Sequence, residues 1–266
     1  MKKLLTILLA CVMLMGSALA MTACGGDDED TLVCGVTPIP GLNEKDADGN
    51  WTIGFETEFA LEVGKILGMK VEFKEIDWNQ KYMEVNSGKI DCIWNGFTKN
   101  SSDDGIPRTD LVDFSYTYML NQQCIVVRKS ELADYTSEAS LAGKSAAVEG
   151  GSAGADYAKK ALGEDGDVAS FPKQMAAFLE VSAGRSDFAV VDILLAQNVC
   201  GKGDYADLAI VDAITLDSEL YAVGFKKGSD LTAKVNEAIK TLYENGTLQA
   251  LAVKYGYENV LQVTID

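Results

Sequence analysis

Hydrophobic and polar positions alternate along the chain with two different periods from residue 31 onward. Phe59, Val63, Ile66 and Leu67 fall on one face of a helix predicted over residues 55–67, and Gly68 ends it. Apolar or alternating runs on either side of this helix are typical of strands. The order strand, helix, strand, helix, strand indicates a parallel sheet covered by helices. The expected strands are 31–36, 71–76 and 90–94, and the expected helices are 55–67 and 81–87.

A second αβ rhythm begins after a polar loop over residues 101–107. Glycines mark the turns between its elements, above all over residues 150–154, directly before a predicted helix. Two α/β lobes of similar size fit the whole pattern better than one large sheet. The expected strands are 123–127, 144–148, 188–191 and 220–225, and the expected helices are 155–162, 175–183, 231–242 and 248–254.

The first residues differ in kind from the rest of the chain. Lys2 and Lys3 precede an apolar run over residues 4–15, and small residues follow over 16–20. A basic start, a short apolar stretch and small residues predict a secretory signal peptide over residues 1–23. A retained membrane anchor is the alternative, but the run is short for a stable membrane span.

The end of this segment, Met21-Thr22-Ala23-Cys24, resembles the bacterial lipobox, which implies a lipidated Cys24 as the mature N-terminus. Residues 24–30 then form a flexible acidic tether. Removal of residues 1–23 leaves 21 basic against 40 acidic residues and a net charge of −19. We therefore expect an exported protein, lipid-anchored to the membrane at the cell surface or in the periplasm.

Charge and composition exclude several classes of function. The chain has 23 Lys and Arg against 40 Asp and Glu, and a chain this acidic is a poor binder of nucleic acid. It has no histidine, which removes Ser-His-Asp, Cys-His and histidine–metal chemistry. No Cys-x-x-Cys pair offers a zinc site. We expect no catalytic residue, no metal and no cofactor.

Four cysteines remain once Cys11 of the signal peptide and the lipidated Cys24 are set aside. Cys34, Cys92 and Cys124 lie in apolar, strand-like runs, and Cys200 comes later in the chain. Buried free thiols are one interpretation. A disulfide between Cys34 and Cys92 is the other, since an exported protein can form one.

Several motifs follow one another in a fixed order. Gly54-Phe55-Glu56 opens the first predicted helix, and Ser87-Gly88-Lys89-Ile90-Asp91 leads toward the turn Asn95-Gly96-Phe97-Thr98. Arg108 stands before Val112-Asp113-Phe114-Ser115, and Gly184-Arg185-Ser186-Asp187 precedes a strand that ends in Asp192. From about residue 31 to 260, this ordered set resembles the amino-acid-binding branch of bacterial extracellular solute-binding proteins, the receptors of ABC importers.

The resemblance implies an α/β, periplasmic-binding-protein-like (type II) fold, whose two lobes close over a ligand about two hinge strands. Lobe 1 is expected to be discontinuous, over residues 31–126 and 219–266, and lobe 2 to span residues 127–218. The resemblance also implies a free amino acid as ligand, ABC permease subunits as partners, and a monomer.

The resemblance implies one candidate partner for each charged end of a free amino acid. Arg108 would hold the carboxylate through two parallel hydrogen bonds, which a lysine cannot reproduce. A surface arginine is the alternative. Asp192 would pair with the ammonium, since open α/β sheets bind ligands at the carboxyl ends of their strands. The alternative for Asp192 is a helix N-cap.

Two turns supply the other implied contacts. Asn95, Gly96 and Thr98 would form the first-lobe turn that receives the ammonium and helps to hold the carboxylate, although Asn-Gly alone is a common turn signal. Ser152 and Ala153 stand just before a helix, whose free N–H groups suit an anion. A flexible loop is the alternative there.

Aromatic residues and departures from the family pattern bear on specificity. Trp78 would form an aromatic wall, with core packing as the alternative, and Trp94 is expected in the core. Residues 103–106 look like an insertion, and Asp103 and Asp104 in it could pair with Arg108. The family's early aromatic has no counterpart in residues 37–42, so the ligand side chain stays open between polar, basic and cystine-like.

Two alternative functions remain. Dehydratases of the prephenate and arogenate type resemble these receptors but use a glutamate in the second-lobe glycine-rich turn. Gly151-Ser152-Ala153-Gly154 has no acid, so we expect a receptor rather than an enzyme. A ligand-sensing module of a larger protein is the other alternative.

Overall fold

The structure is a computed structural model that describes residues 30–163 and 165–265. By its contacts the chain divides into residues 1–30 and 31–266, and every helix and strand named below lies in the second unit. The predicted signal peptide, the lipidation at Cys24 and the tether up to residue 29 lie outside the described residues. In the part of the chain that is described, no helix combines the length and the apolar character needed to cross a membrane.

The first part of the fold is built on a five-stranded sheet with the order β4-β1-β5-β15-β8. β1 pairs in parallel with β4 and β5, which confirms the βαβαβ pattern predicted for residues 31–94. β15 runs antiparallel to both of its neighbours. The strands are β1 Thr31–Val36, β4 Lys70–Glu75, β5 Cys92–Ile93, β8 Asp113–Phe114 and β15 Gly224–Phe225.

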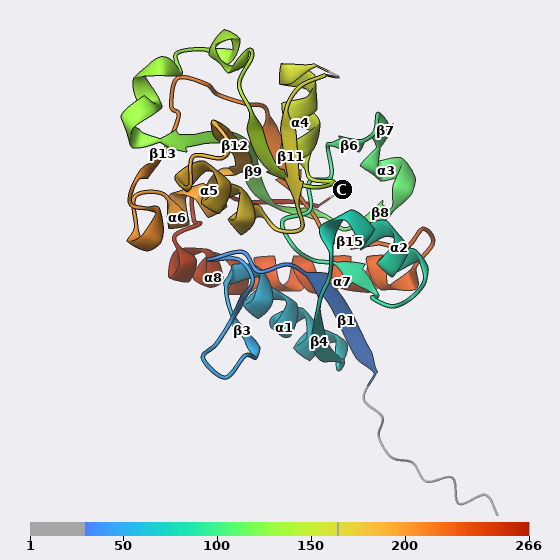
Figure 1. Ribbon diagram of the computed structural model, residues 1–266. Helices are drawn as coiled ribbons and strands as arrows, with labels where there is room; N and C mark the ends of the chain where they lie inside the picture. Colours follow the sequence, from blue (N-terminus) through green and yellow to red (C-terminus); the bar gives the residue numbers. More distant parts are fainter. Residues whose placement is uncertain (1–29, 164, 266) are drawn as a thin grey trace, which may run out of the picture. The chain divides into compact units, whose positions relative to one another are not determined.

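Helices cover this sheet. α1 has the predicted bounds, Phe55–Leu67, and ends because Gly68 adopts the left-handed conformation with φ of 65°. α7 Asp230–Glu244 and α8 Thr247–Tyr255 pack against α1, although they come from the end of the chain (Figure 1). Shorter elements complete this part: β2 Glu44–Lys45, β3 Trp51–Ile53, η1 Trp78–Gln80, α2 Lys81–Asn86 and α3 Arg108–Leu111.

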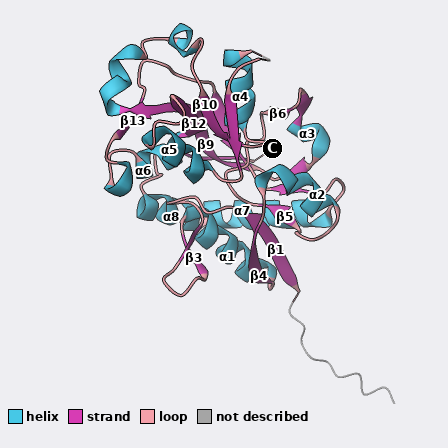
Figure 2. Ribbon diagram, viewed as in Figure 1, coloured by secondary structure: helices cyan, strands magenta, loops and turns pink. Residues whose placement is uncertain are grey.

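A seven-stranded sheet with the path β11-β10-β12-β9-β13 forms the second part, with β14 and β16 also paired to β9. Figure 2 shows the helices α4, α5 and α6 lying around this sheet. Two sheets, each with its own helices, make the fold two-lobed, as predicted. The elements are β9 Thr117–Arg128, η2 Lys129–Asp134, η3 Glu138–Leu141, β10 Ala146–Glu149, α4 Ala153–Leu162, β11 Val168–Phe171, α5 Gln174–Ser182, β12 Phe188–Asp192, α6 Ile193–Val199, η4 Gly203–Tyr205, β13 Leu208–Ile210, β14 Ser218–Tyr221 and β16 Leu261–Thr264.

β9 connects the two halves of its sheet. Its first half pairs with β14 and β16, and its second half pairs with β12 and β13. The predicted single strand over residues 220–225 is wrong, because β14 ends at Tyr221 and β15 begins at Gly224 in the other sheet. The chain therefore passes between the sheets here. The exact lobe boundaries, 126/127 and 218/219, stay a prediction.

Two further expectations need correction. The strand predicted over residues 90–94 is paired only at Cys92–Ile93. The polar loop over residues 101–107 contains a hairpin, β6 Ser102–Asp103 with β7 Ile106–Pro107. This hairpin forms because Asp104 and Gly105 adopt φ of 49° and 80°, the left-handed pair that a tight two-residue turn needs.

Aromatic rings fill the core between α1 and the first sheet. Phe59 meets the rings of Trp94 and Tyr118 edge-on, with centroids 5.0 and 5.3 Å away. Trp94 is fully buried, which confirms its predicted place in the core. Cys34 and Cys92 are register partners on β1 and β5, with their Sγ atoms 3.6 Å apart as separate thiols.

Candidate ligand-binding site

Asp192 ends β12 and is almost fully buried at 4% exposure. Three neutral amides donate to its carboxylate: Gln174, Asn121 with Nδ2 at 2.9 Å and Gln123 with Nε2 at 2.6 Å. Asp192 stands at the N-cap position of α6, but its side chain makes no capping hydrogen bond. The N-cap alternative therefore does not account for the buried carboxylate of Asp192.

Glu219 of β14 shares these amides. Asn121 Nδ2 and Gln123 Nε2 donate to Glu219 Oε2 at 2.6 and 3.1 Å, so two amide groups hold two carboxylates together. Burial raises the pKa of Asp192 and raises the pKa of Glu219 to about 7, where Asp192 adds repulsion. Among the described residues, no Lys or Arg forms an ion pair with either carboxylate. Within the described part of the chain, neither carboxylate of this pair therefore has a cationic side chain as an ion-pair partner.

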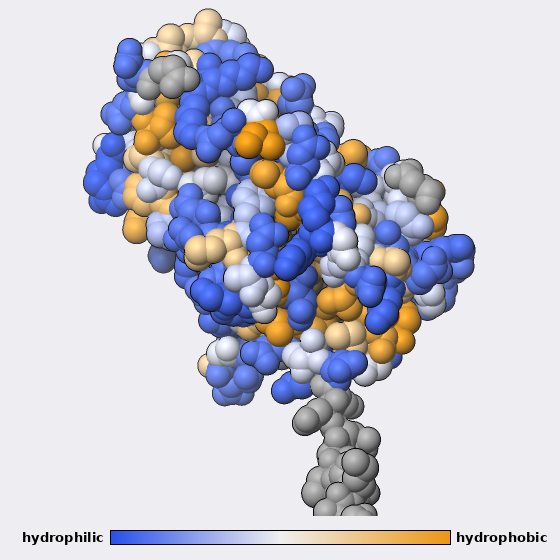
Figure 3. Space-filling model, turned by 90° about the vertical axis from the view of Figure 1, so that its right-hand side faces the viewer, coloured by the Kyte–Doolittle hydropathy of each residue, from blue (hydrophilic) through white to orange (hydrophobic). Residues whose placement is uncertain are grey.

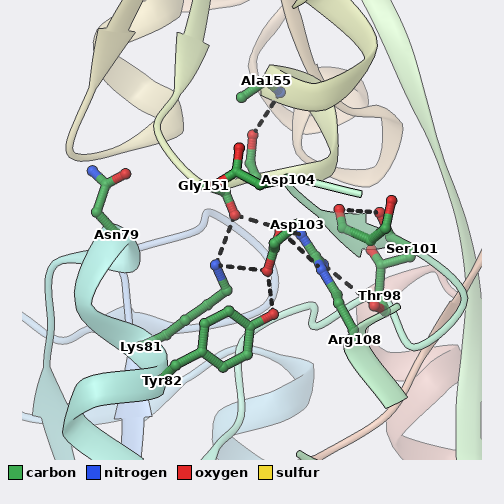
Figure 4. A network of polar contacts seen from close by, with 12 residues as sticks. Asn79, Lys81, Tyr82, Thr98, Ser101, Asp103, Asp104, Arg108, Gly151 and Ala155 are labelled. Carbon is green, nitrogen blue, oxygen red and sulfur yellow. Dashed lines mark hydrogen bonds and ion pairs between the residues drawn. The ribbon is translucent and has the colours of Figure 1, made fainter. Parts of the chain in front are cut away.

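Arg108 begins α3 and is buried, with 1% of its side chain exposed. Its Nη2 and Nε donate to Asp103 Oδ1 at 2.9 and 3.3 Å, and its Nη1 donates to the Thr98 carbonyl oxygen at 3.3 Å. Nη2 also reaches the carbonyl oxygen of Gly151, in the turn before α4, at 3.4 Å (Figure 4). The surface alternative for Arg108 is therefore wrong, and one of the two inserted acids is its partner.

Lys81 and Tyr82 of α2 approach the same place. Lys81 Nζ donates to the Gly151 carbonyl oxygen at 2.8 Å and lies 3.4 Å from Asp103 Oδ2, which also accepts a hydrogen bond from the Tyr82 hydroxyl. Burial and the nearby Arg108 lower the pKa of Lys81 to about 8, while Asp103 opposes this. Burial alone would raise the pKa of Asp103, but Arg108 and Lys81 hold it below its ordinary value.

The turn after β5 is built by buried side chains. Asn95 is used structurally, because its Oδ1 accepts from the Thr37 N–H at 2.8 Å and its Nδ2 donates to the Thr37 carbonyl oxygen at 2.9 Å. Gly96 donates its N–H to Glu56 at 2.9 Å and has φ of 56°. A Cβ on Gly96 would lie 3.1 Å from the Tyr221 ring, so the close approach requires glycine.

The N-terminus of α4 follows the turn that contains Gly151 and is the next part of the candidate site. Ser152 is its N-cap, with Oγ accepting from the Ala155 N–H at 3.1 Å, a contact that stabilises the start of the helix. The N–H groups of the first helical turn, from Ala153 on, point outward from the helix and suit an anion. Glu149 lies just before this turn, and its buried Oε1 has no partner among the described residues. Burial and repulsion from Asp192 raise the pKa of Glu149 well above its usual range.

Trp78 lies beside the basic groups but is packed into the core, with Lys81 Nζ 5.3 Å from its ring centroid. It is 4% exposed and packs edge-on against Phe97, with ring centroids 5.6 Å apart, in a cluster that includes Ile76, Val85 and Val112. This packing favours the core alternative for Trp78 over an aromatic wall.

A cavity of about 1040 Å³ joins several of the candidates. Thr98, Gln123, Ala153 and Glu219 line it, whereas the buried Arg108 and Asp192 are not among its lining residues. On the face turned to the viewer in Figure 3, orange hydrophobic groups are scattered among hydrophilic ones rather than gathered into one patch. The residues that the structure describes contain no group of three or more Cys, Asp or Glu placed to hold a metal.

The structure brings Thr98 and Arg108 to the turn before α4, where Ser152 and Ala153 lie. It joins Asp192 to Gln123, which lines the same cavity as Thr98 and Ala153. Sequence reasoning missed the site roles of Asn121, Gln123 and Glu219. Asn121 and Gln123 carried a signal, because polar residues two apart in an apolar strand point to the same face. Glu219 carried none beyond its place at the expected hinge.

Two α/β lobes joined by long strands, with buried charged groups and a cavity where they meet, define the class of two-lobed ligand-binding proteins. Residues 32–258 match the model of the bacterial extracellular solute-binding proteins, family 3. The chain belongs to this family.

Similar proteins agree with this assignment. The chain is 30% identical over 216 residues to the L-cystine-binding protein TcyA of Bacillus subtilis, covering 81% of this chain and 76% of that protein. An ancestral arginine-binding protein, solved with arginine bound, matches with a TM-score of 0.77 and 32% identity over 85% of this chain and 98% of that one. The ancestral amino-acid-binding protein AncCDT-1, a precursor of cyclohexadienyl dehydratase, matches with a TM-score of 0.74 and 29% identity, over 85% and 95%.

Proposed function

We propose that this protein is the amino-acid-binding receptor of an ABC importer, which captures a free amino acid between its lobes and delivers it to the permease. The observation that carries this proposal is the pair Asp192 and Glu219. Both carboxylates are buried, neutral amides donate to both, neither has a Lys or Arg in an ion pair among the described residues, and Glu219 borders the cavity. Burying ionised groups without a counter-charge is costly, so a ligand with a positive group completes them.

The site separates its charges as an amino acid requires. The ammonium would sit at Asp192 and Glu219. The carboxylate would be held by Arg108 and by the N-terminus of α4, with Ser152 and Ala153 at that end. Thr98 lies between these ends, since it lines the cavity and gives its carbonyl oxygen to Arg108. Asn95 and Gly96 shape the turn that presents Thr98.

The chain's location is part of the same proposal. A signal peptide over residues 1–23 and a lipid on Cys24 would hold the domain outside the cytoplasm, tethered by residues 24–30. Permease subunits of the importer are the proposed partners, and the protein would work as a monomer. Mass spectrometry of the membrane-derived protein should find a diacylglyceryl group on Cys24. An unmodified Cys24 contradicts the anchor.

The proposal includes binding without catalysis. The turn over residues 151–154 has no carboxylate. Glu149, the nearest acid before it, faces Lys81 and Asp192 from a fully buried position. A shared ancestry with a dehydratase does not supply the missing acid in the turn. Incubation with prephenate or arogenate should therefore leave either compound unchanged.

Thermal unfolding of the full chain against each common amino acid and cystine tests the proposal. A ligand that binds only the folded state stabilises it by RT ln(1 + [L]/Kd), about 2.7 kcal/mol at a hundredfold excess, which raises the midpoint by roughly 5–10 °C. Asp192→Asn should reduce affinity by about 30-fold or more. Asp217→Asn is the matched control, because Asp217 lines the same cavity but is exposed.

Two results would contradict the proposal. One is the absence of any shift with every amino acid in protein stripped of co-purified ligand. The other is a shift that Asp192→Asn leaves unchanged, because the ammonium would then have another partner.

A further inference from the structure

The β6–β7 hairpin carries a carboxylate into the positively charged end of the site. Asp103 pairs with Ile106 directly before the tight turn, so its backbone position is fixed by the hairpin. β6 also contacts α4, the helix whose N-terminus faces the same end. The segment is therefore built into the site.

Both oxygens of the Asp103 carboxylate are in use. Oδ1 accepts from Arg108 Nη2 and Nε at 2.9 and 3.3 Å. Oδ2 accepts from the Tyr82 hydroxyl and lies 3.4 Å from Lys81 Nζ (Figure 4). A guanidinium, a second cation and a hydroxyl form a donor set that would equally bind a free carboxylate.

Every guanidinium nitrogen of Arg108 is engaged while Asp103 is in place. Nε and Nη2 donate to Asp103, Nη1 donates to Thr98, Nη2 also reaches Gly151, and only 1% of the side chain is exposed. An incoming carboxylate can pair with the Nε–Nη2 edge of Arg108 through two parallel hydrogen bonds only if Asp103 gives up this position.

Asp104 shows that the neighbouring acid does not share this role. Its carboxylate is 89% exposed, and its ion pair with Lys159 spans 3.6 Å. The two acids differ by one position in the chain, and only Asp103 reaches Arg108.

We propose that Asp103 is an internal carboxylate that competes with the ligand's carboxylate for Arg108 and thereby sets affinity and specificity. This inference rests on the proposed function in taking Arg108 as the carboxylate partner. A competing arrangement lowers apparent affinity by the fraction of molecules in which Arg108 is free. A ligand whose carboxylate is replaced by a neutral amide has only a neutral hydrogen bond to offer in exchange and is disfavoured.

The first test uses acetate and needs no identified ligand. Asp103→Ala, made in the full chain, should leave Arg108 with an open carboxylate position. Sodium acetate at tenfold excess over its Kd should then raise the unfolding midpoint by about 3 °C relative to sodium chloride at the same ionic strength. The wild type and Asp104→Ala should show no such difference. If Asp103→Ala does not fold, Asp103→Ser leaves a similar opening.

The acetate result decides between competition and a purely structural role. Equal responses to acetate in Asp103→Ala, Asp104→Ala and the wild type would overturn the proposal. A specific rise in Asp103→Ala supports it, because a side chain that only braced the hairpin would not be replaced by a free anion.

The second test measures affinity for any amino acid that binds the wild type. Asp103→Asn should bind it at least tenfold more tightly and should discriminate less against its amide, whereas Asp104→Asn should stay within twofold of the wild type. Unchanged or weaker binding in Asp103→Asn overturns the proposal. A protein that binds no amino acid yet shows acetate rescue in Asp103→Ala refutes the proposed function and supports this inference.

Discussion

Glu56 connects the first helix to the turn over residues 95–98, and its protonation should control how stability depends on pH. Its carboxyl group is fully buried and accepts from the Gly96 N–H at 2.9 Å, from Asn43 Nδ2 at 3.1 Å and from the Tyr118 hydroxyl. Burial raises the pKa of Glu56 from 4.5 to about 7, while the hydrogen bonds from Tyr118 and Gly96 oppose the rise. The folded protein therefore keeps a proton that the unfolded chain has lost.

The direction and the size of the pH effect on stability follow from this difference in pKa between the folded and the unfolded state. Because the pKa is higher in the folded state, the contribution of Glu56 to stability is fully present below about pH 4.5 and is lost as pH rises through 7. The interval from 4.5 to about 7 corresponds to about 3 kcal/mol in total. Roughly 2 kcal/mol of this should be lost between about pH 5 and about pH 7.5.

Glu56→Gln tests this prediction, because the amide keeps the shape of the protonated acid and cannot ionise. Its Oε1 can accept from Gly96 and Asn43, while its Nε2 donates to the Tyr118 oxygen. The free energy of unfolding, measured by urea titration near both pH values, should fall by about 2 kcal/mol less in Glu56→Gln than in the wild type. Glu72→Gln, an exposed strand position, is the control and should follow the wild type. Parallel pH dependence in Glu56→Gln and the wild type would refute the reasoning.

Three further outcomes follow from the site and the core. Burial raises the pKa of Glu219 to about 7, and a bound ammonium favours its ionised form. Ligand affinity measured by calorimetry should therefore increase as pH rises from about 6 to 8, and Glu219→Gln should flatten this dependence. Gly96→Ala should destabilise the domain by about 1–3 kcal/mol in urea titrations, since φ of 56° and the Tyr221 ring both oppose a Cβ. An alanine variant as stable as the wild type would contradict that. Alkylation at about pH 8 should modify Cys200 first, because Cys34, Cys92 and Cys124 are buried. Mass spectrometry of peptides from denatured, unreduced protein should then find adducts on all four of Cys34, Cys92, Cys124 and Cys200, and adducts missing from Cys34 and Cys92 would indicate a disulfide between them.

Local patterns were sufficient where a local cause fixes the structure. The bounds of α1 follow from the apolar face through Phe59 and Val63 and from Gly68, whose left-handed conformation ends the helix. The parallel pairing of β1 with β4 and β5 follows from the strand–helix order alone. The place of Asp192 at the carboxyl end of a buried strand also follows from the local pattern, whereas its role toward an ammonium came from the family resemblance and stays a prediction.

Long-range pairings account for what the sequence did not reveal. Residues 220–225 form one apolar run, yet Leu220 pairs with β9 and Gly224 pairs with β5 and β8. Glu219 joins Asn121 across 98 positions in the chain, so no local pattern marks it as a site residue. The choice of Asp103 over Asp104 as the partner of Arg108 depends on the hairpin, since Asp103 ends β6 and Asp104 lies in the turn with φ of 49°.

The distribution of charge assigns different tasks to the two ends of the site. At the acidic end, Asp192 and Glu219 have only neutral donors, so an ammonium creates a charge pair that the unliganded protein lacks. At the basic end, Arg108 already pairs with Asp103, so a ligand carboxylate held there, as proposed, would exchange one ion pair for another of the same kind. An exchange contributes little net free energy compared with a newly formed pair in a buried environment. Affinity should therefore arise mainly at Asp192 and Glu219. Discrimination between carboxylates and neutral analogues should arise at Arg108, where the ligand's carboxylate would have to displace the carboxylate of Asp103.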